Sequence, residues 1–447
     1  MPPPIIDDCG CLETWQKNLL GTDVVLEKAR DSGFIDRLRK LQPVYLLYIL
    51  IFGISSHCKP SFEEIYRRYI DFDDTPHKDG KIRRQSFSNR FNEKLVKFLR
   101  EMLLYYVDLM LSESSAKLKG AVQDLNDIII QDSTIIRLSN KLVNEFPATR
   151  SSSNAAGLKI HAVYSAIHHS LTSAEITGER VHDSKMHDLG LKIKNVLFLF
   201  DLGYYKHSTF ANIDAQGGFF VSRLKSNAKP KVAQIFSSSI LAKKQFQEGM
   251  KLKDFLKKIP KRGTIDLLCT FNVKFSSDKG KSKFSPMNFR VVCFWDEKKS
   301  IWRSYVSNLP GIAYNVKEVY HLYRYRWIIE LLFKELKGDY GLGNLLLAKT
   351  PLAYIHIYSM LIRLVLSRNL YKLIIKTTKK EEQNRYGPLL WSKVFAEQCL
   401  EFLSILCQNF FGKENVKERW KKLELSLRHL SKSRHKIKRL SLEFITF

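Results

Sequence analysis

The sequence has no long uninterrupted hydrophobic run. Its most apolar stretch, residues 44–54, is 11 residues long, whereas a membrane-spanning helix needs roughly 20 residues. A second apolar stretch, residues 351–375, is interrupted by His356, Arg363 and Arg368. The first ten residues carry acid where the basic start of a secretory leader would stand. These features predict an intracellular protein with no membrane role.

Cysteine is scarce, and its number is odd. The seven cysteines are scattered at positions 9, 11, 58, 269, 293, 399 and 407. An odd, scattered set favours reduced thiols over a disulfide framework. Cys9 and Cys11 have no second group of cysteines or histidines at zinc spacing, so no structural zinc site is predicted there. The sequence also lacks internal repeats and long low-complexity tracts.

Acidic residues are few compared with basic ones. The chain has 73 Lys and Arg against 45 Asp and Glu, which gives a formal net charge of +28. Such an excess repels itself in a compact fold unless a polyanion neutralises it, and nucleic acid is the usual polyanion. With 447 residues, 45% of them hydrophobic, the chain can fold throughout, and this length suggests about two to four domains.

Residues 1–120 are predicted to form a helical DNA-binding domain. Ser61 and Glu64 fit a helix capping box, and residues 73–80 are rich in turn-forming types. Residues 83–102 then show one apolar stripe at helical spacing, made by Phe87, Phe91, Leu95, Phe98 and Met102. The opposite face carries Arg84, Arg90 and Lys94, which suits contact with DNA in a helix-turn-helix arrangement. An ordinary amphipathic surface helix is the alternative interpretation.

Residues 121–223 change to an α/β pattern with short strands. Apolar or β-rich runs occur at residues 128–130, 158–167, 171–181, 196–200 and 219–221, with helices expected at 182–193 and 209–215. The run at 196–200 is wholly apolar, which is typical of a strand in a sheet covered on both faces.

The second half of the chain is divided into three parts. Residues 224–310 are predicted to be an all-β insertion, with strands at 265–273, 289–295 and 302–306. Residues 311–375 return to helices, one at 314–337 and a second at 354–374. Residues 376–447 are predicted to be a basic helical C-terminal region, because 413–439 has 11 Lys or Arg and only 3 Asp or Glu.

Two aspartates directly follow apolar strand signals. Asp132 follows residues 128–130, and Asp201 follows residues 196–200. Ligand sites in open α/β sheets collect at strand ends, and two adjacent carboxylates are costly unless a cation lies between them. Their hard oxygen atoms suit Mg²⁺ or Mn²⁺. Each aspartate alone is equally typical of a turn or a helix N-cap.

Four functional side chains recur along the helix expected at 314–337. Tyr323, Arg326, Glu330 and Lys337 are three, four and seven residues apart, so they share one helix face. A tyrosine hydroxyl, an arginine fork, a carboxylate and an ammonium in one line suit phosphate binding around a metal ligand. The alternative is an ordinary ladder of surface ion pairs.

This pattern resembles the Y-R-E-K signature of DDE transposases of the insertion-sequence-four family, the group that includes the transposon-five transposase. Tyr323, Arg326, Glu330 and Lys337 match its four positions and spacings. Asp132 in IIIQDSTII and Asp201 in LFLFDLGYY resemble the first and second aspartate motifs of the family. The order of Asp, Asp, β-insertion and Glu is also similar, over roughly residues 120–375.

The resemblance implies a ribonuclease-H-like core, in two parts at 121–223 and 311–375, that cuts and joins DNA. Asp132, Asp201 and Glu330 would hold two Mg²⁺ or Mn²⁺ ions. Tyr323, Arg326 and Lys337 would grip the backbone of a DNA hairpin. Trp302, or else Trp295, would stack on a base turned out of the helix, although a plain buried tryptophan is the alternative for both.

The partners implied are double-stranded transposon ends and target DNA, bound by a homodimer in the cytoplasm of a prokaryote. Two rival functions are a catalytically silent DNA-binding protein derived from a transposase and a stand-alone nuclease. Among other polar residues, Asp183 and Asp188 are expected to cap or begin the next helix, and an approach to the site is the alternative for both. His161 and His182 are expected to make ordinary hydrogen bonds.

Overall fold

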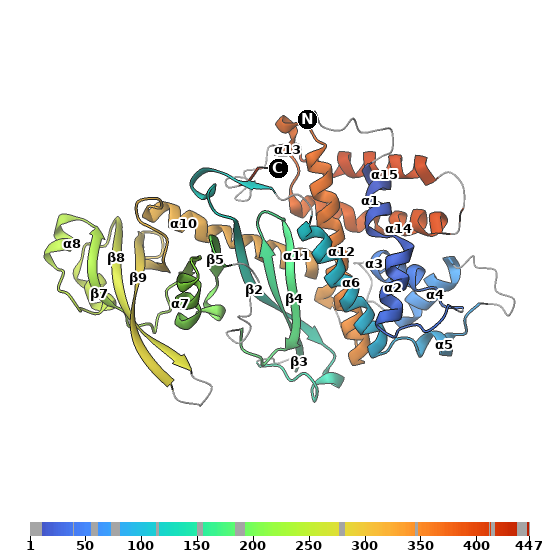
Figure 1. Ribbon diagram of the computed structural model, residues 1–447, viewed down its shortest axis with the longest axis horizontal. Coiled ribbons are helices and arrows are strands. Elements are labelled where there is room, and N and C mark those ends of the chain that lie inside the picture. The colour runs from blue at the N-terminus through green and yellow to red at the C-terminus, as the bar shows by residue number, and fades with distance from the viewer. Residues whose placement is uncertain are drawn as a thin grey trace.

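The structure is a computed structural model that describes residues 11–38, 40–54, 61–72, 81–112, 116–149, 155–183, 193–276, 282–344, 347–410, 412, 416–435 and 445–446. The turn expected at 73–80, most of the helix expected at 182–193, and Asp188 lie outside these residues. Figure 1 shows a central sheet with the strands of the insertion at one end and most of the helices at the other.

The central strands form a mixed sheet. In spatial order they are β4 (Ser170–Gly178), β3 (Ala156–Ser165), β2 (Asp127–Leu138), β5 (Val196–Phe200) and β6 (Phe219–Arg223). The pairs β4–β3 and β3–β2 are antiparallel, whereas β2–β5 and β5–β6 are parallel. Three antiparallel strands beside two parallel ones make a ribonuclease-H-like sheet, so the predicted fold class is confirmed.

The insertion extends this same sheet. β10 (Ile301–Ser307) pairs antiparallel with β6, and β9 (Ser282–Asp296), β8 (Thr264–Ser276) and β7 (Lys231–Ser237) follow outward. The sequence predicts strands alone here, but the insertion also has two short helices, α8 (Ile240–Lys244) and α9 (Leu252–Lys258). Ser239 caps α8 by accepting a hydrogen bond from the amide of Ala242, and α9 buries Leu252 and Phe255.

Both faces of the sheet are covered, as the apolar run at 196–200 predicts. Phe198 and Phe200 face a cluster that includes Phe210 of α7 (His207–Ala215). Leu197 and Leu199 face a second cluster, which also contains side chains of α10 (Val316–Tyr325), α11 (Trp327–Lys337) and α12 (Thr350–Lys376). Successive residues of a strand point to opposite faces, so a strand between two cores must be apolar at every position.

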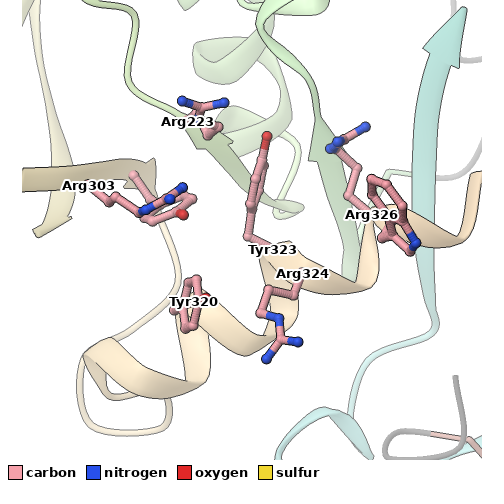
Figure 2. Close-up of a pocket in the computed structure, with 8 residues that line it drawn as sticks. Arg223, Arg303, Tyr320, Tyr323, Arg324 and Arg326 are labelled. Atoms are coloured by element: carbon pink, nitrogen blue, oxygen red, sulfur yellow. The ribbon is translucent and has the colours of Figure 1, made fainter. Parts of the chain in front are cut away.

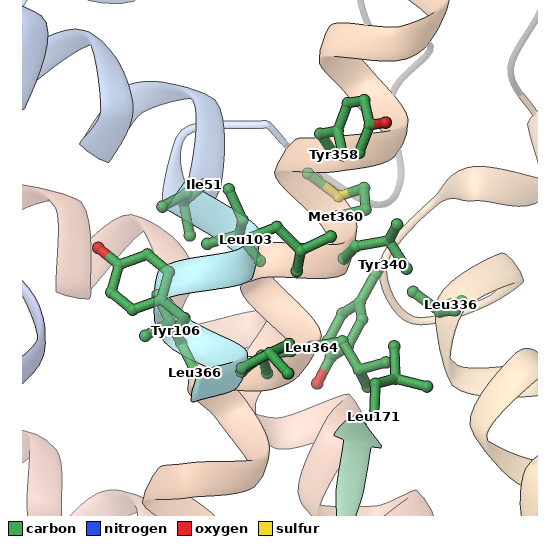
Figure 3. Close-up of a cluster of buried hydrophobic side chains, with 14 of the residues drawn as sticks. Ile51, Leu103, Tyr106, Leu171, Leu336, Tyr340, Tyr358, Met360, Leu364 and Leu366 are labelled. Carbon is green, nitrogen blue, oxygen red and sulfur yellow. The ribbon is translucent and has the colours of Figure 1, made fainter. Parts of the chain in front are cut away.

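The N-terminal and C-terminal helices share one hydrophobic cluster. The first group is α1 (Cys11–Leu19), α2 (Thr22–Asp31), α3 (Pro43–Phe52), α4 (Phe62–Phe72), α5 (Arg84–Ser88) and α6 (Glu93–Ser112). The second is α14 (Pro388–Phe410) and α15 (Val416–Leu430), whereas the short α13 (Lys380–Gln383) has no buried residue. Both groups pack around α12, and α3 and α6 contact it directly. Figure 3 shows Ile51, Leu103, Tyr106 and Leu364 within this cluster.

A second, two-stranded sheet joins β1 (Lys117–Leu118) to β11 (Ile445–Thr446), which pair antiparallel.

Helix α12 is the only helix in the described part of the chain that is long and apolar enough to cross a membrane, and 78% of its most apolar window is buried inside the protein. The polar residues that interrupt it are buried too. Arg363 donates hydrogen bonds to the carbonyl oxygens of Ile51 and Ile54. Arg368 pairs with Glu335 of α11. Helix α12 therefore serves as a core helix of the helical region.

Residues 83–102 form two helices, so the prediction of a single helix is wrong. α5 ends at Ser88 and α6 begins at Glu93. Between the two helices, the side-chain amide of Asn92 donates a hydrogen bond to the backbone carbonyl of Asn89. The side-chain oxygen of Asn92 accepts a hydrogen bond from the backbone amide of Lys94. Asparagine side chains that bond to the local backbone compete with the helix and favour its termini. The predicted apolar stripe is nevertheless buried or half-buried.

Residues 314–337 also form two helices instead of the single helix predicted. α10 ends at Tyr325, α11 begins at Trp327, and Arg326 lies between them. Around it, the amide of Arg326 donates to the carbonyl of Tyr323, and the amide of Ile329 donates to the carbonyl of Arg326. These bonds span three residues in place of four, which tightens the helix by a local 3₁₀ turn.

Candidate active site

The two aspartates lie side by side where two parallel strands stop pairing. The parallel pairing between β2 and β5 ends at Gln131 and Phe200. Asp132 follows Gln131 in the sequence, and Asp201 follows Phe200. Asp201 follows the end of β5, as predicted. Asp132 is not at a strand end, because β2 continues to Leu138 while paired with β3.

Arg326 joins Asp132 to Glu330. Its Nη1 atom lies 2.9 Å from Oδ2 of Asp132, and its Nη2 atom pairs with Oε1 of Glu330. These side chains are mostly buried, with exposed fractions of 13% for Arg326, 16% for Asp132 and 33% for Glu330. The hydroxyl of Tyr323 donates a hydrogen bond of 3.5 Å to Oδ1 of Asp201. Tyr323 and Arg326 thus connect α10 and α11 to the three carboxylates.

The electrostatics of Asp132 show why positive charge is needed here. Burial raises the pKa of Asp132 to about 7, and the carboxylates of Asp201 and Glu330 add to that rise, while Arg326 opposes it. For Arg326, burial lowers the guanidinium pKa, but Tyr323, Asp132 and Asp201 outweigh burial and raise it. Several carboxylates so close together are stable only beside a cation.

The three carboxylates suit a divalent metal ion by their chemistry, since hard cations prefer carboxylate oxygens. Within the residues that the structure describes, however, no three Asp, Glu, His or Cys side chains lie close enough to hold one ion together. Arg326 supplies the positive charge between Asp132 and Glu330. The chemistry of the three carboxylates thus suits a metal ion, and in this structure Arg326 supplies the positive charge in its place.

A basic and aromatic cavity of about 350 Å³ adjoins the carboxylates. It lies between β6, β10, α10 and the start of α11, and its described lining residues include no acid. They are Arg223, Arg303, Tyr305, Tyr320, Tyr323, Arg324, Arg326 and Trp327. Figure 2 shows Tyr323 standing between Arg303 on one side and Arg326 on the other. Arg303 is held by Asp296, whose Oδ2 atom lies 2.6 Å from its Nε atom.

Sequence reasoning missed six residues of this cavity, namely Arg223, Arg303, Tyr305, Tyr320, Arg324 and Trp327. The first two come from β6 and β10, and no local pattern links them to the helix. The helical spacing places Trp327 on the apolar side of that helix, yet it is 51% exposed. Its position directly after Arg326 is the signal that could have found it.

Trp302 lies on the other face of β10. Its neighbour Arg303 lines the cavity, and successive strand residues point to opposite faces. Trp302 instead packs against the cluster that contains Phe198, Phe200 and Phe210. Its ring centroid lies 5.6 Å from that of Trp295. The structure does not bring either tryptophan into the cavity, and their contact with a flipped base stays a prediction.

The remaining predicted DNA-binding residues lie elsewhere. Lys337 is half-buried at the end of α11, where burial, followed by the charge of Arg137, lowers its pKa. Arg84 on α5 is exposed and pairs with Glu63. Arg90 lies in the turn before α6, and Lys94 is exposed on α6. DNA contact by these four residues stays a prediction.

Of the other polar residues considered, His161 and Asp183 lie beside the aspartates. His161 is buried and hydrogen-bonds to Tyr204 and Thr177, each at 2.9 Å, and burial lowers its pKa to about 4. This agrees with the expectation of ordinary hydrogen bonds. Asp183 accepts hydrogen bonds from Ser133 and Lys159. His182 is exposed.

The sheet, the three carboxylates and the Tyr–Arg–Glu–Lys segment together define a DDE transposase. The chain belongs to the family described as the transposase DDE domain, whose model matches residues 124–366. Proteins of this family generally use divalent metal ions.

Curated relatives are insertion-sequence transposases. The chain is 25% identical over 399 residues to the transposase for insertion sequence element IS1151 of Clostridium perfringens, covering 81% of this chain and 82% of the relative. It is 23% identical to the transposase for IS231F of Bacillus thuringiensis subsp. israelensis, covering 80% of each. A solved structure, the synaptic complex of piggyBac transposase with hairpin DNA, aligns with a TM-score of 0.48 and 9% identity, covering 96% of this chain and 86% of that one.

Proposed function

We propose that this protein cuts DNA at transposon ends and joins the ends to target DNA in a metal-dependent cut-and-paste reaction. The observation that carries the proposal is the convergence of Asp132, Asp201 and Glu330 beside a basic cavity. The carboxylates come from β2, the end of β5 and α11, and Tyr323 and Arg326 contact all three.

Asp132, Asp201 and Glu330 would hold two Mg²⁺ or Mn²⁺ ions. When bound, these ions would activate the attacking water or 3′-hydroxyl and stabilise the leaving oxygen. Arg326 then needs another anionic partner, and a DNA phosphate offers one. Its buried Nε atom, which has no hydrogen-bond partner among the described residues, can also donate to that phosphate.

The cavity would bind the DNA backbone next to the cut. Its arginines can pair with phosphates, and its aromatic rings can stack on an unpaired base. This combination suits a hairpin intermediate, in which the backbone is bent sharply and a base leaves the stack. Tyr323 and Arg326 would hold the phosphate nearest that base, and Lys337 would hold the adjoining backbone.

The net charge of +28 supports binding to both transposon-end and target DNA. Joining two transposon ends to one target requires two active sites, so the DNA-bound form is proposed to be a homodimer. The bacterial origin of the relatives supports a cytoplasmic, DNA-associated protein in a prokaryote.

The test is cleavage of a labelled transposon end by Asp132→Ala, Asp201→Ala and Glu330→Ala, with Mg²⁺ present. Each variant should lose cleavage and keep DNA binding, because the three carboxylates act as a unit. Asp254→Ala changes an exposed carboxylate of α9 and should cut normally. A variant that cuts at nearly the wild-type rate would remove its residue from the site. Cleavage without joining would indicate a stand-alone nuclease, and a wild-type chain that binds ends without cutting them would indicate a silent DNA-binding protein.

A further inference from the structure

Asp183 lies close to the catalytic aspartates but is not one of the three carboxylates assigned to the metals. Its side chain is 21% exposed. Oδ1 of Asp183 accepts a hydrogen bond of 3.0 Å from the hydroxyl of Ser133 and another of 3.0 Å from Nζ of Lys159. Lys159 is itself buried, and its Nζ also donates to the carbonyl of Val181 at 2.8 Å. The charge of Asp183 is thus neutralised within the fold.

The first contact leads directly to Asp132. Ser133 follows Asp132 on β2, and its backbone amide donates a hydrogen bond of 2.8 Å to Oδ1 of Asp132. Ser133 therefore binds Asp132 through its backbone and Asp183 through its side chain. Any shift of Asp183 moves the residue that orients the carboxylate of Asp132.

The second contact leads to Asp201. Asp183 packs against Gly203, two residues after Asp201, so closely that a Cβ atom at position 203 would lie 2.6 Å from Oδ2 of Asp183. A distance that short is sterically forbidden, which explains why the turn has glycine here. Tyr204, the next residue, is held by its hydrogen bond to His161. The turn that carries Asp201 thus packs against the side chain of Asp183.

We propose that Asp183 is a positioning residue that sets the spacing between Asp132 and Asp201, with Lys159 as its counter-charge. Backbone pairing between β2 and β5 ends at Gln131 and Phe200. From there on, Asp183 contacts both segments, one through Ser133 and the other through Gly203. This inference rests on the proposed function, because the spacing matters only if both aspartates hold the metal ions.

The test measures Mn²⁺ binding to the purified full-length chain by electron paramagnetic resonance. Asp132→Ala defines the signal that belongs to the site. Asp183→Ala should raise the dissociation constant of that site by about tenfold or more, since loss of a partner behind metal ligands typically weakens binding 10–100-fold. Asp183→Asn retains an acceptor for Ser133 and loses the charge for Lys159, so its loss should be smaller. This milder variant also serves if Asp183→Ala does not fold.

Asp214→Ala is the matched control, because Asp214 is a surface carboxylate of α7 that accepts a hydrogen bond of 2.8 Å from Asn308. It should leave Mn²⁺ binding unchanged. Wild-type Mn²⁺ affinity in both Asp183 variants would overturn the inference, and so would a lower melting temperature with unchanged affinity, because Asp183 would then be merely structural. If Asp132→Ala binds Mn²⁺ as the wild type does, the proposed metal site fails and the inference falls with it.

Discussion

The guanidinium of Arg326 lies 2.9 Å from the carboxylate of Asp132, although 194 residues separate them in sequence. The same guanidinium also pairs with Glu330. One arginine therefore neutralises two of the carboxylates proposed to hold metal ions. Arginine and metal compete for the same oxygen atoms, since both are cations that bind carboxylates.

Arg326→Gln should increase the affinity of the DNA-free protein for Mn²⁺. A charge-assisted hydrogen bond to a carboxylate contributes about 1.5–3 kcal/mol, so removing this competing contact should raise the Mn²⁺ affinity roughly 10–100-fold. Electron paramagnetic resonance titration of Mn²⁺ measures the change. Arg324→Gln is the control, because the Arg324 guanidinium lies over the ring of Tyr320. Equal Mn²⁺ affinities in wild type and Arg326→Gln would show that the arginine does not compete.

Trp327→Ala should slow hairpin formation more than it slows the first nick. Trp327 lines the cavity and is 51% exposed, so it can stack on an unpaired base, a contact worth about 1–3 kcal/mol. Trp302→Ala should mainly lower the melting temperature, because Trp302 packs against the cluster that contains Phe198, Phe200 and Phe210. A time course resolving nicked and hairpin DNA, with 2-aminopurine fluorescence to report unstacking, compares the two. A selective hairpin defect in Trp302→Ala alone would restore Trp302 as the stacking residue.

Lys337→Met should stabilise the protein slightly at neutral pH while weakening DNA binding. Burial lowers the pKa of Lys337 below its ordinary value of 10.5, so keeping the ammonium charged costs free energy in the folded state. The cost is fully present well below that pKa and disappears as the pH rises through it towards 10.5. The melting temperature should therefore rise slightly at pH 7 and rise less at pH 10. If Lys337→Met instead has a lower melting temperature at pH 7, the charge of Lys337 stabilises the fold, and DNA binding is not needed to explain it.

Arg290→Met should strongly destabilise the insertion. Arg290 and Asp266 form a buried two-pronged ion pair at 2.8 and 2.7 Å, and Arg290 also donates to the carbonyl of Leu309 at 2.9 Å. Leaving Asp266 buried without its partner costs about 3–5 kcal/mol. Adding Asp266→Leu should recover most of that loss. Urea unfolding measures both variants, and Lys257→Met in the exposed pair with Asp254 should cost less than about 1 kcal/mol.

The sequence by itself predicted the chemistry proposed for the site and determined the type of fold. The spacing of Tyr323, Arg326, Glu330 and Lys337 is a local signal, because residues three, four and seven apart share a helix face. The apolar run at 196–200 likewise predicts a strand covered on both faces. The excess of basic residues by itself indicates nucleic acid as the partner. Each of these signals depends on near neighbours in the chain or on composition alone.

Only the tertiary structure decided how these parts meet. The parallel pairing of β2 with β5 brings Asp132 beside Asp201, and nothing local in either segment specifies that partner. Arg223 and Arg303 reach the cavity because the insertion continues the central sheet through β10 and β6. The contact of Asp183 with Ser133 and Gly203 depends on the fold of three separate segments, so no local pattern in the sequence predicts it. Long-range packing fixes such contacts, because their cost in chain entropy is repaid only when the whole core forms.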